Sequence, residues 1–156
     1  PTSKAHPHIR ARAIDLPQVV PIARKIIKEE RMDDRIDVIA ANVVTDSLPG
    51  GYDVAVLRGF LQVLSPEDAR LADKNFGAAV NQGGKIFIIG QILDDSRMSP
   101  AEAVGFNLAF INSYDAGESY TESEHRGWLT EAGFVEIDRA DFLLDGSGLM
   151  TARKQP

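Results

Sequence analysis

Short apolar segments alternate with longer amphipathic segments along this chain, and this alternation limits the possible folds more than any other feature. Ile9–Asp15, Arg35–Asn42 and Lys85–Gln91 have the length and the β-branched content of strands. Tyr52–Leu57 is apolar almost throughout, a pattern typical of a strand covered on both faces. In Pro17–Glu30 the apolar residues recur at helical spacing opposite a face of Lys, Arg and Glu, which predicts a helix. This order predicts a layered α/β fold with a mainly parallel sheet.

Helix starts mark the second half of the chain. Ser65-Pro66-Glu67-Asp68 combines an N-cap hydroxyl, a proline at the first helical position and acidic residues in the first turn. It predicts a helix that runs to about Val80. Ser99-Pro100-Ala101-Glu102 and Thr121-Glu122-Ser123-Glu124 both have the spacing of a capping box, so each predicts a further helix.

The C-terminal region predicts an antiparallel strand pair. Phe134–Leu143 and Leu149–Arg153 flank Asp145-Gly146-Ser147-Gly148, which has the composition of a hairpin turn. A length of 156 residues favours one domain, here residues 1–156. The first residue is Pro1 and not Met, which suggests a piece of a longer protein.

Composition and charge restrict the class of partner. The chain has 17 Lys and Arg against 23 Asp and Glu, a net charge of −6, so a nucleic-acid surface is not expected. Without cysteine it can form neither a disulfide nor a thiolate metal site. No apolar run approaches the roughly 20 residues that span a bilayer, and no signal peptide is visible. We therefore expect a cytoplasmic protein that binds a small molecule or another protein, not a membrane.

Polar residues stand at the predicted ends of four strands, and in open α/β sheets ligands bind beyond these carboxyl ends. They are Asp15, Asn42, Arg58 and Gln91. The carboxylate of Asp15 can accept hydrogen bonds from two adjacent hydroxyls of a nucleotide ribose, or it can cap the following helix. Asn42 and Arg58, each taken singly, are also compatible with ordinary surface positions.

The histidines give little indication of chemistry. His6 and His8 could share a metal ion, but two ligands without a third do not make a site. His125 follows a helix start and is expected to be exposed, while Trp128 with Leu129 is expected in the core. No Gly-x-Gly-x-x-Gly loop follows any predicted strand, although a nucleotide-binding domain should carry one after its first strand.

Four blocks of sequence, in the same order and at similar spacing, resemble one family of enzymes. The blocks are Ile14-Asp15-Leu16-Pro17-Gln18-Val19 with Pro21-Ile22-Ala23; Ala40-Ala41-Asn42-Val43 before Leu48-Pro49-Gly50-Gly51-Tyr52-Asp53; Leu57–Ala69; and Glu131-Ala132-Gly133-Phe134. They resemble the class I S-adenosylmethionine-dependent O-methyltransferases that act on plant and polyketide small molecules. The resemblance extends over nearly the whole chain from Lys4.

The resemblance implies a Rossmann-like methyltransferase sheet whose first strand and glycine-rich loop are missing here. Lys4-Ala5-His6-Pro7-His8 resembles the tail of the helix that follows that loop. The missing strand would lie between Ile9–Ile14 and Tyr52–Leu57. We therefore expect another polypeptide segment, or a different strand order, beside Tyr52–Leu57. We also expect a homodimer or another oligomer, and little or no cofactor binding by the chain alone.

The same resemblance assigns residues to an S-adenosylmethionine site. Asp15 matches the acid that holds the ribose and Leu16 lies beside it. Asn42 and Val43 match the adenine contact, although the family usually has Asp where Asn42 stands. Arg58 matches a position that lines the cofactor site.

The catalytic positions depart further from the family. Gln62 stands where the family has its general base, a histidine, and an amide cannot take a proton near neutral pH. Gln91 and Ser119 align with the acids that orient that histidine, with Glu118 one place away. The helix around three further residues is implied to bind the acceptor substrate: Phe106, Asn107 and Phe110.

Three hypotheses follow. The first is methyl transfer to the oxygen of a small aromatic or polyketide-like acceptor, driven by proximity and not by a histidine base. The second is a relative that keeps the cofactor for another reaction, such as hydroxylation or decarboxylation. The third is a non-catalytic fragment that forms oligomers. The sequence alone does not separate them.

Overall fold

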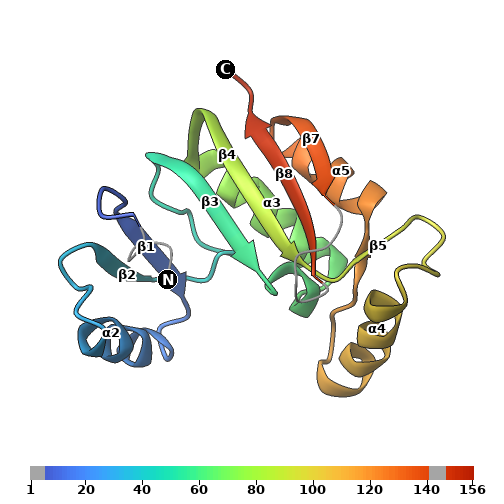
Figure 1. Ribbon diagram of the computed structural model, residues 1–156, viewed down its shortest axis with the longest axis horizontal. Coiled ribbons are helices and arrows are strands. Elements are labelled where there is room, and N and C mark those ends of the chain that lie inside the picture. The colour runs from blue at the N-terminus through green and yellow to red at the C-terminus, as the bar shows by residue number, and fades with distance from the viewer. Residues whose placement is uncertain (1–5, 141–146) are drawn as a thin grey trace. The chain divides into compact units, whose positions relative to one another are not determined.

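The computed structural model describes residues 6–140 and 147–156, and the chain divides into two compact units after Asp46 (Figure 1). The first unit comprises residues 1–46 and the second residues 47–156. Each unit is described by itself below.

The first unit is a short β-α-β motif. β1 (Ala11–Asp15) and β2 (Ile36–Ala40) are parallel, and α2 (Val20–Glu29) connects them. The register runs from Ala11 opposite Ile36 to Asp15 opposite Ala40, so both strands end at the same edge.

The connecting helix begins later than the sequence predicts. Its N-cap is Val19, which offers no capping side chain, and a turn closed by the N–H of Val19 on the carbonyl of Leu16 precedes it. Asp15 is therefore not the N-cap, and that alternative is wrong. The carboxylate of Asp15 remains available for another role.

The second unit is built on a mixed four-stranded sheet in the order β3-β4-β8-β7. Its strands are β3 (Tyr52–Arg58), β4 (Val80–Gly90), β8 (Gly148–Lys154) and β7 (Phe134–Ala140). β3 and β4 are parallel, whereas β4 with β8 and β8 with β7 are antiparallel. The predicted α/β class with a C-terminal antiparallel pair is confirmed, and the predicted strand residues 141–143 and turn residues 145 and 146 lie outside the described residues.

The burial predicted for the third strand is wrong. In β3 the side chains of Val54 and Val56 are 51% and 63% exposed, and only Leu57 is buried. Val54 and Val56 lie two positions apart and share one face of the strand, which the described part of the chain leaves uncovered. Within the described residues β3 also pairs with β4 alone and is the edge strand of its sheet. Our expectation that another segment pairs beside Tyr52–Leu57 stays a prediction.

Two helices lie behind this sheet in Figure 1, α3 (Pro66–Ala79) and α5 (Glu122–Glu131). The predicted starts of both are confirmed. The hydroxyl of Ser65 accepts a hydrogen bond from the N–H of Asp68 at 3.1 Å, and Thr121 forms a complete capping box with Glu124.

The packed face of α3 carries small residues and one acid. A β-carbon added at Gly77 would lie 2.4 Å from the carbonyl oxygen of Ala132, so only glycine permits this close approach to the end of α5. On the same helix Asp73 is fully buried, and neither carboxylate oxygen has a hydrogen-bond partner in the described part of the chain. Burial raises the pKa of Asp73 to about 8.

The remaining elements form a smaller layer. β5 (Ile92–Leu93) pairs in parallel with β6 (Tyr120–Thr121), and α4 (Ala101–Ser113) contacts β5. The capping box predicted at residues 99–102 is wrong. The N-cap of α4 is Pro100, which has no side-chain acceptor, and the N–H of Ser99 donates to Asp94 Oδ1 at 3.3 Å instead.

Candidate functional site

The adjacent ends of β1 and β2 bring two predicted site residues together. Asp15 is exposed, and its Oδ1 atom accepts a hydrogen bond from the N–H of Leu16 at 2.8 Å. Asp15 is joined to the next strand end because the N–H of Ala41 donates to its carbonyl oxygen at 3.0 Å. Asn42 follows directly and is half-buried, with its Oδ1 atom accepting from the N–H of Val44 at 3.0 Å.

These strand ends have the donor and acceptor set that a nucleoside needs. Asp15 Oδ2 forms no hydrogen bond with residues that the structure describes, so it can accept from sugar hydroxyls. The amide nitrogen of Asn42 is a donor, and the oxygen has a second lone pair beside its bond to Val44. Leu16 is 39% exposed and provides apolar surface beside the polar groups, whereas Val43 is buried. The residues present in this unit fit the ribose and base of S-adenosylmethionine.

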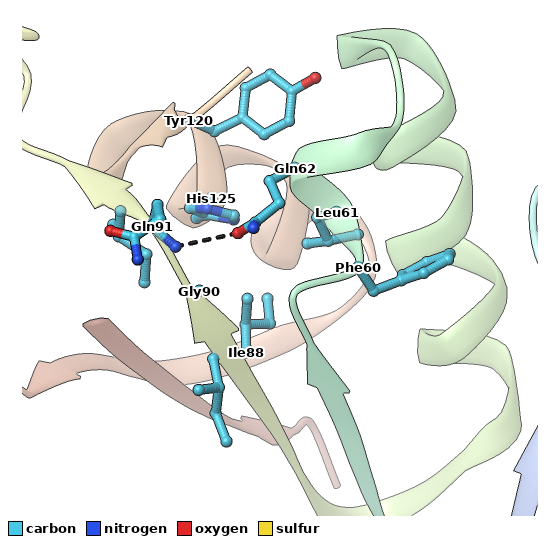
Figure 2. Close-up of a pocket in the computed structure, with 10 residues that line it drawn as sticks. Phe60, Leu61, Gln62, Ile88, Gly90, Gln91, Tyr120 and His125 are labelled. Atoms are coloured by element: carbon cyan, nitrogen blue, oxygen red, sulfur yellow. Dashed lines mark hydrogen bonds between the residues drawn. The ribbon is translucent and has the colours of Figure 1, made fainter. Parts of the chain in front are cut away.

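The ends of β3 and β4 are joined by an amide side chain. Gln62 lies in the short helix η1 (Leu61–Val63) that follows β3, and Gln91 follows β4 directly. Gln62 Oε1 accepts a hydrogen bond from the N–H of Gln91 at 3.1 Å, drawn as the dashed line in Figure 2. The structure therefore brings together two glutamines that are 29 positions apart.

A small pocket surrounds this hydrogen bond. The volume open to the centre of a water molecule is only about 10 Å³, room for about one water. Its lining is mostly apolar, with two amide and two aromatic polar side chains: Phe60, Leu61, Gln62, Ile88, Ile89, Gly90, Gln91, Ile92, Tyr120 and His125. Gln91 Oε1 is buried and has no partner among the described residues.

His125 is buried in the wall of this pocket, and its predicted exposure is wrong. The side chain is 3% exposed and stacks edge-to-face with Tyr120 and Trp128. Burial, reinforced by the charge of Arg139, lowers the pKa of His125 to about 4. Spacing could have revealed this position, because His125 lies one helical turn before Leu129, which is fully buried.

Tyr120 is the second pocket residue that the sequence reasoning missed. Its hydroxyl donates a hydrogen bond to the carbonyl oxygen of Leu64 at 2.6 Å. Burial, together with the charges of Glu118 and Glu124, raises its pKa above the ordinary range. Tyr120 is therefore a neutral donor that is already committed to the backbone. No local pattern distinguishes it from an ordinary strand tyrosine.

The residues predicted to bind the acceptor have different surroundings. Asn107 Oδ1 accepts from the N–H of Ser119 at 2.8 Å, and the hydroxyl of Ser119 donates to the carbonyl of Ala103, so both have structural partners. Phe110 is buried, whereas Phe106 is 49% exposed, with ring centroids 6.1 Å apart.

The two remaining predicted residues lie at the surface. Arg58 is exposed at the end of β3, and Glu118 pairs with Arg97 at 2.9 Å. The carboxylate of Glu118 is therefore bonded to a cationic side chain.

The part of the chain that the structure describes contains neither a candidate metal site nor a candidate membrane span. Among the described residues no three His, Asp or Glu side chains could hold a metal ion, and the rings of His6 and His8 pack edge-to-face with their centroids 5.9 Å apart. No helix in the described ranges is long and apolar enough to cross a membrane.

The comparisons with known proteins agree on one family. The family model for the O-methyltransferase domain matches residues 2–135. The chain is 29% identical over 149 residues to the 3-hydroxy-5-methyl-1-naphthoate 3-O-methyltransferase of Streptomyces sahachiroi, covering 96% of this chain and 43% of that protein. It is 28% identical to the tetracenomycin polyketide synthesis 8-O-methyl transferase of Streptomyces glaucescens, covering 86% and 39%.

Solved structures give the same result. The apo structure of the S-adenosylmethionine-dependent methyltransferase SibL superimposes with a TM-score of 0.88 at 28% identity, over 99% of this chain and 46% of that one. PigF with SAH gives a TM-score of 0.86 at 25% identity, covering 97% and 45%. The chain thus spans less than half the length of these relatives.

Proposed function

Because this chain belongs to the O-methyltransferase domain family, we propose that the protein transfers a methyl group from S-adenosylmethionine to an oxygen of a small aromatic or polyketide-like acceptor. The names of both Streptomyces relatives describe O-methyl transfer, one to a naphthoate and one in polyketide synthesis. The observation that carries the proposal is the exposed Asp15 carboxylate, held beside Asn42 at the joined ends of two parallel strands.

Each residue at these strand ends has a chemical role in the proposal. Asp15 accepts hydrogen bonds from the ribose hydroxyls, and Asn42 bonds the polar edge of the adenine. Leu16 and Val43 provide apolar contacts to the nucleoside. Arg58, at the end of β3, is proposed to line the cofactor site as well. When bound, the cofactor supplies a methyl group on a positively charged sulfur.

The acceptor half of the proposal does without a histidine base. Gln62 takes the family position of that base, and an amide does not accept a proton near neutral pH. Acceleration then depends on alignment of the acceptor with the methyl group, for which effective molarities of ~10⁵ M or more are known. Gln91 and Phe106 are the proposed acceptor contacts, with Asn107 and Phe110 supporting the same segment.

Calorimetry on the complete protein tests the cofactor assignment. We expect Asp15→Ala to weaken S-adenosylmethionine binding by roughly 1–3 kcal/mol, because the ribose hydroxyls lose a charged acceptor. Asp33→Ala, at an exposed acid of the same unit, is the matched control and should leave affinity unchanged. Unchanged affinity in Asp15→Ala would contradict the ribose assignment.

Mass spectrometry of the product tests the reaction class. Methyl transfer adds one CH₂ to the acceptor mass and produces one S-adenosylhomocysteine per turnover. A product that has instead gained an oxygen or lost carbon dioxide would support the hydroxylase or decarboxylase alternative and contradict the proposal.

A further inference from the structure

The orientation of the Gln62 amide is fixed by its hydrogen bond to the end of β4. The N–H of Gln91 is a donor, so only the amide oxygen of Gln62 can meet it, at 3.1 Å. The amide nitrogen therefore points away from this bond, as Figure 2 shows. Gln62 Nε2 forms no hydrogen bond with any residue that the structure describes. The side chain therefore presents two N–H donors, while its oxygen is held by the N–H of Gln91.

Gly90 makes this orientation possible. A β-carbon added at Gly90 would lie 2.5 Å from Gln62 Oε1, closer than real β-carbon contacts. Any other residue at position 90 would displace the amide from the N–H of Gln91. Gly90 and the Gln91 backbone thus act as positioning groups for Gln62.

The pocket contains no group suited to remove a proton near neutral pH. Its two titratable side chains are Tyr120, a neutral donor bonded to Leu64, and His125, a buried imidazole. A general base works best when its pKa lies near the operating pH, and that of His125 is about 4.

The charged groups around these two side chains are also unsuited to be bases. They are Glu118, Glu124, Arg97, Arg139 and Asp68. Arg97 pairs with Glu118 and Glu124 at 2.9 and 2.6 Å, and Arg139 pairs with Glu122 at 3.2 Å. Asp68 lies in the first turn of α3, where a carboxylate interacts favourably with the positive end of the helix.

We propose that Gln62 binds the acceptor oxygen as a hydrogen-bond donor, and that the acceptor is an acidic phenol or enol which has already lost its proton to solvent. This inference rests on the proposed function, since it places the acceptor oxygen at Gln62. The anionic oxygen gains the methyl group, the S–CH₃ bond breaks with its electron pair left on sulfur, and no proton remains for the protein to remove. A donor at this position stabilises the anionic acceptor more than the neutral one, because a hydrogen bond to a charged oxygen is the stronger of the two.

A spectrophotometric titration tests the inference without catalysis. The complete protein is loaded with S-adenosylhomocysteine, and 4-nitrophenol, whose anion absorbs at a different wavelength from the neutral form, is titrated with pH. We expect the bound phenol to ionise at a lower pH than it does in water. Gln62→Leu should remove this shift and weaken binding of the anion by roughly 10–100-fold, the range of a hydrogen bond to a charged group.

Two further variants separate the donor role from a structural one. Gly90→Ala keeps the amide but displaces it, so it should also reduce the shift. Gln62→Glu places a negative charge at the phenol oxygen and should reverse the shift. Gln82→Leu, at an exposed glutamine of β4, is the matched control and should leave the titration unchanged. Circular dichroism identifies any variant that has unfolded.

Methyl-transfer rates with phenols of graded acidity separate this inference from the proposed function. We expect the pH at which kcat/KM reaches half its maximum to follow the pKa of each acceptor. If kcat/KM reached half its maximum at the same pH for every acceptor, a protein group would be removing the proton. A bound phenol that stays neutral in the titration would lead to the same conclusion. Both results would overturn the inference while leaving methyl transfer intact. Absence of methylated product from every phenol, with the titration shift present, would contradict the proposed function instead.

Discussion

Two regions of the molecule can be compared: the pocket at the ends of β3 and β4, and the packed face of α3. Each buries one titratable side chain that has at least one polar atom without a hydrogen-bond partner in the described part of the chain. In the pocket the group is His125, whose Nδ1 atom is unpaired, and under α3 it is Asp73, whose two oxygens are unpaired among the described residues. Burial disfavours the charged form of both, so the pKa of the base falls to about 4 and that of the acid rises to about 8.

One physical cause thus produces opposite pH dependences of stability. For Asp73, the folded state holds a proton that the unfolded state releases above pH 3.8, so stability is lost as the pH rises from about 4 to 8. For His125, the unfolded state binds a proton below pH 6.5, whereas the folded state does not bind it until about pH 4. Stability is therefore lost as the pH falls from 6.5 to about 4. Between about pH 4 and 6.5 the two contributions oppose each other.

Replacement of Asp73 should give the largest effect. Asp73→Asn keeps the shape and polarity of the neutral acid but cannot ionise, so the variant should match the wild type below pH 4. At pH 7 it should be more stable by about 4 kcal/mol, because each pH unit above the unfolded pKa contributes about 1.4 kcal/mol. Urea unfolding at a series of pH values measures the difference.

The control for this experiment is an exposed acid on the same helix. Glu67→Gln lies in the first turn of α3 and should change stability by only a few tenths of a kcal/mol. If the difference between Asp73→Asn and wild type stays constant with pH, Asp73 is not buried in its protonated form.

The replacement of His125 should have the opposite pH dependence, with a gain in stability at low pH that is somewhat smaller than the gain for Asp73→Asn at high pH. His125→Phe keeps the edge-to-face packing on Tyr120 and Trp128 but does not titrate. The variant should gain about 3 kcal/mol over wild type between pH 7 and pH 4, since the unfolded wild type alone binds a proton in that window. His8→Gln, at an exposed histidine, should show no such gain. If the free energy of unfolding changed with pH in the same way for His125→Phe and His8→Gln, His125 would be able to bind a proton in the folded protein.

The sequence predicts those features of the structure that depend on interactions between near neighbours in the chain. The capping box of α5 and the β1 end with Asp15 were predicted because their hydrogen bonds join residues one to three positions apart. The exposed side of β3 was not, because the same apolar pattern serves an edge strand and a central one.

Long-range partners were beyond the sequence for a similar reason. The bond from Gln91 to Gln62 depends on the register of two strands and on the missing side chain at Gly90. Asp73 lies one turn after the buried Ala69, so helical spacing places it on the packed face. Spacing does not tell whether a buried acid will find a partner there.

Tyr120 is a buried polar side chain that, unlike His125 and Asp73, has a partner for its polar atom among the described residues. Tyr120→Phe removes the donor to Leu64 and leaves a carbonyl oxygen unpaired, which should cost about 2 kcal/mol. The loss should be the same from pH 4 to 8, since the hydroxyl stays neutral throughout. Tyr114→Phe, at a ring that is 48% exposed, should cost much less. A loss that varies with pH in this range would show that Tyr120 is coupled to the titration of His125.

Replacement of Gln91 is expected to give the smallest change in stability. It tests whether the unpaired Oε1 atom of Gln91 contacts the acceptor or has no role in function. Its Oε1 atom is buried without a partner in the described ranges, so the folded protein gains little from it. Gln91→Met keeps the length of the side chain and the backbone N–H that orients Gln62, and it should alter the free energy of unfolding by less than about 1 kcal/mol. If Gln91 contacts the acceptor, as proposed, the KM for the acceptor should rise severalfold while kcat changes little, because a contact present in both ground and transition states was removed. An unchanged KM would show that Gln91 does not contact the acceptor. Its unpaired oxygen would then only destabilise the folded state, like the carboxylate of Asp73.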